Sequence, residues 1–271
     1  MIKNKKICIC ADDFGLSDSI SEGIIDLVKN KRIQAVSCII NKKPFLKYYK
    51  KLRKFERDVD IGLHINLTEN EKGINLKFNN LNNILISLFY IFFKKKLIKK
   101  EIISQIRKFE KYFKFKPKHI DGHHHIHQYP VIRSLLISCV KNFNPFIRQS
   151  GDNIFNIFSR KVSILKAIII SFFCKKFKFM LKNNNLRYNK SFSGIYNFKL
   201  NLNYKNNFYK FLRKISNQHI IMCHPAKKTL KDKYNDTISD ARFKEYSFYT
   251  SKKFKRILKN KKINFIPTSK F

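Results

Sequence analysis

Five of the eight histidines in this 271-residue chain lie between Lys118 and His127, in the sequence KHIDGHHHIH. Neutral imidazole is a common ligand of divalent transition metals, so a run of this kind predicts a metal site. The alternative is a solvated His-rich loop or an expression tag. The run is internal, between a strand-like KHID stretch and a proline, Pro130, that is well placed to begin a helix. This context favours the metal site.

Two adjacent carboxylates, Asp12 and Asp13, end the first predicted strand. Residues 7–11 are continuously apolar, as in a strand buried on both faces of a parallel sheet, and Gly15 follows shortly after the aspartates. Because neighbouring strand residues point to opposite faces, a turn must bring the second carboxylate round. One aspartate would then hold a cation while the other stays free as a base. On this motif alone, the alternative that both cap the next helix stays open.

Single histidines close two other predicted strands. His64 lies near the end of the stretch 59–66, and His224 directly follows the apolar stretch 219–223. A lone histidine at such a place is more often structural than functional, unless other ligands converge on it.

Strand-like and helical stretches alternate along the whole chain. Strands are expected at residues 7–11, 35–40, 59–66, 118–121, 145–148, 191–194, 219–223 and 263–266. Such alternation predicts an α/β fold with a mostly parallel sheet. Because polar residues fall at the downstream ends of strands, we predict a TIM-barrel-like (β/α) barrel of seven or eight strands. Residues 1–271 are expected to form one domain, with helical insertions near 70–98 and 153–190.

The charge of the chain is strongly basic, with 58 Lys and Arg against 18 Asp and Glu and a formal net charge of +40. A charge of this size would normally suggest a nucleic acid or an anionic membrane as partner. The lysines are spread over the whole chain, however, and no zinc-finger, RNP or helix-turn-helix signature is present. We therefore expect solvated basic faces and no specific nucleic-acid partner.

The cysteines and apolar runs bear on the compartment. Six cysteines without a CxxC pair or a framework spacing indicate buried thiols in a reducing environment, and the N-terminus shows no apolar stretch of signal length. Residues 84–93 and 164–174 are too short or too interrupted to cross a bilayer. A cytoplasmic protein without a transmembrane segment is expected. The apolar and basic segment 153–182 could contact a membrane surface, cover the barrel mouth or pack against a second subunit in a homodimer.

Four stretches resemble the signature motifs of the YdjC-like (ChbG/HpnK) carbohydrate deacetylases in order and approximate spacing. They are ADDFGLSDSISEGI, DIGLHINLT, HIDGHHHIHQYP and IMCHPA, and the resemblance runs from Ile7 to about Phe265. It implies an irregular (β/α) barrel that removes the N-acetyl group from an amino sugar, in an oligosaccharide or a glycolipid, with one divalent cation. Ala226 stands where many members have glycine, which leaves the identity of the substrate open.

The resemblance also implies roles for seven residues of this chain. They are the metal ligands Asp13, His64 and His123, the general base Asp12, the acid or substrate-orienting group His224, and the substrate contacts His125 and His127. Which histidine of the run binds the metal is open, because His127 could also be a ligand.

The chemistry of amide hydrolysis agrees with these roles. It needs an activated water, a polarised carbonyl and a proton for the departing amine, and one ion beside a carboxylate base can supply the first two. Two imidazoles and one carboxylate suit Zn²⁺, whereas the family resemblance implies Mg²⁺. Two other functions are kept as alternatives: a phosphoesterase with two metals about 3.5–4 Å apart, and a basic nucleic-acid-binding protein with an incidental histidine run.

Overall fold

The computed structural model describes residues 5–69, 73–77, 81–198, 203–228, 236–259 and 263–271. Within these residues, eight strands form one sheet in which every pairing is parallel. The strands are β1 (Lys5–Phe14), β2 (Ala35–Cys38), β3 (Asp60–Ile65), β4 (His119–Gly122), β5 (Phe146–Ile147), β6 (Ser191–Ser193), β7 (His219–Cys223) and β8 (Ile263–Phe265). Their order is β5-β4-β3-β2-β1-β7-β6, and β8 pairs with β1. The predicted parallel α/β sheet is confirmed.

The two ends of this sheet approach one another, which gives the fold its barrel-like shape. Ile147 in β5 forms a parallel bridge with Tyr188, just before β6, and its N–H donates to the carbonyl of Arg187 at 2.8 Å. Next to this bridge, Gln149 and Asn189 exchange hydrogen bonds between backbone and side-chain groups. The predicted irregular barrel is therefore confirmed, with a short closure between β5 and the segment that precedes β6.

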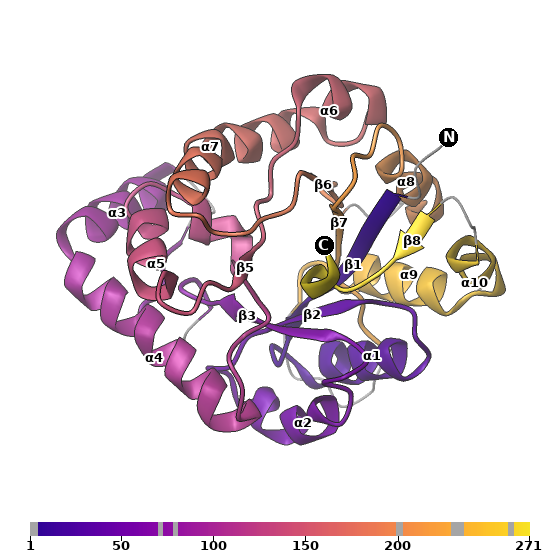
Figure 1. Ribbon diagram of the computed structural model, residues 1–271, viewed down its shortest axis with the longest axis horizontal. Helices are drawn as coiled ribbons and strands as arrows, with labels where there is room; N and C mark the ends of the chain where they lie inside the picture. The colour runs from indigo at the N-terminus through magenta and orange to yellow at the C-terminus, as the bar shows by residue number, and fades with distance from the viewer. Residues whose placement is uncertain (1–4, 70–72, 78–80, 199–202, 229–235, 260–262) are drawn as a thin grey trace.

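Ten α-helices lie around the strands among the described residues (Figure 1). They are α1 (Asp18–Lys29), α2 (Lys43–Arg53), α3 (Leu81–Phe93), α4 (Lys95–Phe113), α5 (Ile132–Val140), α6 (Ile154–Arg160), α7 (Ile164–Asn183), α8 (Tyr204–Phe211), α9 (Ser239–Thr250) and α10 (Lys252–Leu258). Short 3₁₀ helices follow β4 (η1, His123–Gln128) and β8 (η2, Thr268–Lys270). Helices α9 and α10 are divided at Ser251, whose extended backbone ends α9 and whose hydroxyl caps α10 by accepting from Phe254 N.

The continuous apolar runs of the strands are explained by two apolar layers, one on each face of the sheet. In β1, Ile7 and Ile9 pack in the large cluster between the sheet and the helices, whereas Cys8 and Cys10 belong to a smaller cluster on the opposite face. Since strand side chains alternate between faces, both faces of β1 must be apolar. The carboxyl ends of the strands carry the polar residues described below.

The cysteines and apolar helices agree with the expectations from the sequence. All six thiols are free, and all are buried except that of Cys139, which is partly exposed. Across the part of the chain that the structure describes, none of the helices combines the length and apolar character needed to span a bilayer.

Candidate metal site and active site

The end of β1 brings two carboxylates to the same edge of the sheet. Asp13 has a left-handed backbone with φ of 69°, and the register between β1 and β2 shifts between Ala11 and Phe14. A bulge of this kind re-aims one side chain, which removes the alternation expected of neighbouring strand residues. Asp12 and Asp13 are both almost completely buried there.

Asp13, His64 and His123 converge on one point. Asp13 Oδ1 lies 2.9 Å from His123 Nδ1 and 3.4 Å from His64 Nε2, and the three side chains are buried. From the residues that the structure describes, Asp13 Oδ1 nevertheless accepts no hydrogen bond of acceptable geometry. One carboxylate oxygen and two ring nitrogens within 4.8 Å of one another form a donor set that fits a divalent cation. The structure thus brings together the three ligands predicted from the sequence.

A carboxylate that the sequence analysis did not assign, Asp121, orients His64. The two are register partners on the adjacent parallel strands β3 and β4, and His64 Nδ1 lies 2.5 Å from Asp121 Oδ1. An imidazole that donates from Nδ1 directs the Nε2 lone pair at the ligand position, as in carboxylate–histidine–metal arrangements. Burial alone would lower the pKa of His64, but Asp121 and Asp12 outweigh it and raise this pKa to about 10.

Arg148, which directly follows β5, joins the two carboxylates that are not in the ligand set. Its Nη1 and Nη2 donate to the two oxygens of Asp12 at 2.6 and 2.7 Å, and its Nε forms an ion pair with Asp121 at 3.0 Å. Burial raises the pKa of Asp12 above its usual value, although Arg148 opposes this shift. The same arginine lowers the pKa of Asp121 against the effect of burial, together with His64.

A second arginine, Arg242 from α9, holds the other oxygen of Asp13. Its Nη2 donates to Asp13 Oδ2 at 2.7 Å, and its Nε pairs with Asp236 at 2.7 Å. Burial would raise the pKa of Asp13, but His123 and Arg242 outweigh it and hold this pKa well below its usual range. Asp13 is therefore ionised, with Oδ2 engaged and Oδ1 turned to the histidines.

Two further clusters of metal-binding residue types adjoin Asp13, His64 and His123. In each of them, another side chain already occupies the place that an ion would take. The group Asp12, His64 and Asp121 is bridged by the Arg148 guanidinium. The positively charged guanidinium of Arg148 already lies between these carboxylates, so a metal ion at the same place would be repelled by it. The phosphoesterase alternative, which needs two bridged metals, is disfavoured by this arrangement.

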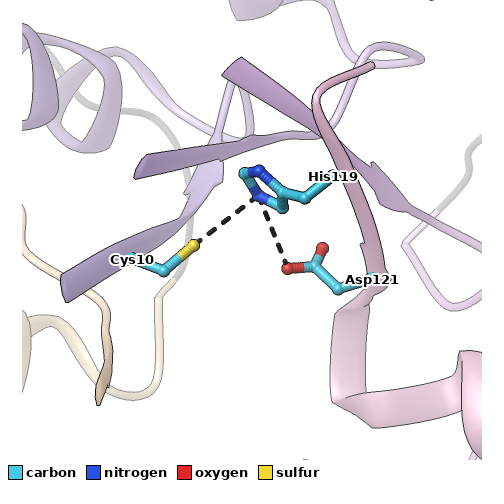
Figure 2. Close-up of side chains that lie close together, drawn as sticks. All are labelled: Cys10, His119 and Asp121. Carbon is cyan, nitrogen blue, oxygen red and sulfur yellow. Dashed lines mark hydrogen bonds and ion pairs between the residues drawn. The ribbon is translucent and has the colours of Figure 1, made fainter. Parts of the chain in front are cut away.

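The group Cys10, His119 and Asp121 lies on β1 and β4 (Figure 2). Ser37 Oγ lies 2.9 Å from His119 Nε2 and 3.3 Å from Cys10 Sγ, and it donates to Asp121 Oδ2 at 2.6 Å. A hydroxyl thus occupies the centre of the group. Burial, reinforced by Asp12, raises the pKa of the Cys10 thiol, which keeps the sulfur protonated and a poor ligand.

The last such cluster, Glu69, His123 and His124, shares His123 with the proposed ligand set. Its members are more exposed, since Glu69 is half-buried and His124 is exposed. It marks the solvent side of the site.

The histidine run forms the 3₁₀ helix η1, and its members point in different directions. His124 and His125 have left-handed backbones, with φ of 53° and 57°. His125 is half-buried, with its ring edge-on to Phe192 at 5.9 Å. His127 is fully buried, and its Nε2 donates to the Arg148 carbonyl at 2.8 Å, so it lies beneath the site and supports Arg148.

His224 follows β7 and lies at the edge of the site. Its ring is 13% exposed and packs edge-on against Phe198, and its Nδ1 has no hydrogen-bond partner among the described residues. Its backbone N–H donates to Glu245 at 2.6 Å. Burial and the two site arginines outweigh the carboxylate of Asp13, so the pKa of His224 lies well below its usual value and the ring is neutral.

Three residues of the site were not assigned a role from the sequence: Asp121, Arg148 and Arg242. The first two stand at the downstream ends of predicted strands, and this position was a usable signal. Arg242 lies in the helix α9, where nothing local distinguishes it from many other basic residues.

Solved structures place this architecture in a class of α/β barrel-like folds. An Enterococcus faecalis V583 protein named as a cellobiose-phosphate cleavage protein superposes with a TM-score of 0.66 and 18% identity, over 99% of both chains. The Xyl-CE4 domain of a multidomain xylanase from the hindgut metagenome of Trinervitermes trinervoides gives a TM-score of 0.50 and 10% identity, over 99% of this chain and 89% of that one. At these identities the likeness concerns the fold.

Sequence comparison identifies the family. Residues 6–260 match the YdjC-like protein family, so the chain belongs to it. It is 25% identical over 155 residues to a chitooligosaccharide deacetylase of Escherichia fergusonii and 30% identical over 142 residues to a carbohydrate deacetylase of Xenopus laevis. These matches cover 55% and 48% of this chain, and 61% and 46% of the respective relatives.

Proposed function

We propose that this protein is a metal-dependent carbohydrate N-deacetylase, which hydrolyses the N-acetyl group of an amino sugar and releases acetate. The convergence of Asp13, His64 and His123 beside a second, arginine-held carboxylate, Asp12, carries the proposal. The names of the two relatives, a chitooligosaccharide deacetylase and a carbohydrate deacetylase, support an acetylated carbohydrate as the substrate class.

In this proposal, Asp13 Oδ1, His64 Nε2 and His123 Nδ1 hold one divalent cation. When bound, the cation would acidify a water molecule and polarise the acetyl carbonyl. The two imidazoles and one carboxylate favour Zn²⁺ or a similar transition ion, although the oxygen ligand also admits Mg²⁺. Once His64 has given up its proton to serve as a ligand, the three carboxylates Asp12, Asp13 and Asp121 and the guanidinium groups of Arg148 and Arg242 leave one net negative charge, which a cation would offset.

Asp12 is the proposed general base. Arg148 holds both of its oxygens, so the carboxylate has a single orientation, and each oxygen keeps a lone pair that can accept a proton from water. The raised pKa of Asp12 makes it a stronger base than an exposed aspartate.

His224 is the proposed contact to the nitrogen of the substrate. Its side chain is 13% exposed, but its Nδ1 is buried and lies 4.0 Å from Glu245 Oε1, so Nε2 is the nitrogen proposed to accept or relay a proton. Because the resting ring is neutral, His224 first orients the amide, and the proton that Asp12 takes from water then passes to the departing nitrogen with His224 as relay. His125, half-buried beside Phe192, is proposed to contact the sugar, whereas His127 acts through Arg148.

The test is acetate release from a panel of N-acetylated amino sugars, free and lipid-linked, by protein loaded with Zn²⁺ or Mg²⁺. We expect release from at least one member, loss on chelation and recovery when the metal is restored. The matched variants are Asp13→Ala, which should lose metal and turnover together, and Asp12→Asn, which should keep metal. Turnover that persists after exhaustive metal removal would overturn the proposal, as would phosphate-ester hydrolysis without acetate release.

A further inference from the structure

Helices α6 and α7 expose an apolar face to solvent. On α7, Leu165, Ile169, Phe172 and Phe179 recur at helical spacing on the outer side of the helix, and Phe172 is 75% exposed. On α6, Phe155 is 78% exposed, and Ile154 and Phe158 are exposed beside it. Exposed clusters of large apolar side chains mark interaction surfaces more often than scattered ones do.

The opposite face of α7 packs against the end of the histidine run, so the exposed face is separated from η1 by the width of the helix. Phe173 stacks on Tyr129 with ring centroids 4.8 Å apart, Phe177 packs edge-on against His127 at 5.6 Å, and Gln128 donates to the carbonyl of Ile170 at 3.2 Å. Figure 1 shows α6 and α7 adjacent to one another along one edge of the molecule. A partner bound to the exposed face of α7 would therefore be one helix width away from η1.

The charges on these helices are all of one sign. Together α6 and α7 carry an arginine and five lysines but no aspartate or glutamate. Lys176 lies in the exposed stripe itself, with its ammonium 5.0 Å from the ring of Phe179, and Lys175 and Lys182 are exposed beside it. Aromatic side chains interleaved with lysines are typical of helices that lie in the interface of an anionic membrane.

A second copy of the chain fits this face less well. A two-fold symmetric contact would bring the same patch of each copy together and so place its lysines opposite one another. The formal net charge of +40 adds long-range repulsion between copies, whereas an anionic lipid surface attracts the same charges.

We propose that the outer face of α6 and α7 docks on an anionic membrane surface, with Phe155, Leu165 and Phe172 entering the interfacial layer. If the proposed deacetylase function also holds, this placement presents the head group of a membrane-anchored glycolipid to the site. The docking itself does not depend on that function.

The test is cosedimentation of the full-length protein with vesicles of phosphatidylcholine, with and without about 30% phosphatidylglycerol, at about 0.15 M salt. The variants are Phe172→Asp and Leu165→Asp. The matched control is Leu46→Asp, because Leu46 is 52% exposed on the Lys-rich helix α2 but lies outside this face. Each substitution changes the charge by the same amount at an exposed position.

We expect the parent to bind the anionic vesicles and the two α7 variants to bind about tenfold more weakly or worse, as loss of one buried apolar side chain implies. Leu46→Asp should bind like the parent. Equal binding by all four proteins, or equal weakening by Leu46→Asp, would show non-specific attraction and overturn the proposal. So would failure of the parent to bind, or a parent dimer that Phe172→Asp dissociates, which would make a second copy the occupant. Acetate release from soluble substrates should be the same in Phe172→Asp and the parent, and it tests the function separately.

Discussion

Replacing Asp121 by asparagine should show whether this carboxylate supports the proposed metal site in addition to stabilising the fold. Asp121 accepts hydrogen bonds from His64 Nδ1 and Ser37 Oγ and pairs with Arg148 Nε. Asparagine has the same shape but one acceptor oxygen and no charge, so it cannot serve all three groups. The His64 ring would then be held less firmly at Nδ1, and the direction of its Nε2 lone pair would no longer be fixed.

Two effects of Asp121→Asn can be estimated from these contacts. Loss of a carboxylate that orients a metal-binding histidine typically weakens metal affinity by about 10- to 100-fold. Removing one member of a buried charge network, which leaves Arg148 with Asp12 alone, should lower the free energy of unfolding by about 3–5 kcal/mol. The metal-free protein is used for the second measurement, so that the two effects stay separate.

The matched control is Asp60→Asn, at the opposite end of β3 from the metal site. Asp60 is also buried, and its carboxylate accepts from Thr268 Oγ1, Ser269 N and Ser269 Oγ at 2.7–2.8 Å. Asp60→Asn should lose stability but keep its affinity for Zn²⁺, measured by competition with a chelating dye. Equal Zn²⁺ affinity in Asp121→Asn, Asp60→Asn and the parent would refute the reasoning.

The stability difference between the parent and Asp121→Asn should also depend on pH. Since the folded protein holds the pKa of Asp121 below its usual value, the contribution of the carboxylate is complete above the unfolded pKa of about 4 and is lost as the pH falls further. Denaturation of the metal-free proteins should therefore show a difference that is largest near neutral pH and shrinks below about pH 4. A difference that grows on acidification would contradict the assigned contacts.

Three further predictions concern other contacts of the site. Asp12→Asn should bind Zn²⁺ like the parent but lose acetate release, because the amide cannot take a proton from water; unchanged turnover would remove the base assignment. Gly62→Ala should lower the free energy of unfolding by about 1–3 kcal/mol, since a Cβ there would lie 2.4 Å from the ring of buried His119; denaturation with urea measures this. Burial raises the pKa of Glu245 to about 8, so its ionisation costs stability as pH rises from about 4.5 to 8, and Glu245→Gln should flatten the pH dependence of urea denaturation over this window.

Much of the fold follows from local patterns. The apolar runs that end in polar residues predicted the parallel strands, and the structure has strands at each of the expected places. Helix boundaries are less certain from the sequence: α1 is capped by Ser17, whose hydroxyl accepts from Ile20 N. Serines are frequent at this helix start, so the local pattern could not distinguish among them.

The sequence predicted that Asp13, His64 and the histidine run would meet: the motifs shared with the family implied it, and parallel strands bring their downstream ends to one edge of a sheet. It also placed Asp12 beside them. Only the tertiary structure decided which groups hold these residues: Arg148 is 136 positions from Asp12, and Arg242 is 229 from Asp13. Such contacts depend on how the sheet curves and on where a helix packs against it, and neither is set by the residues near each arginine in the chain.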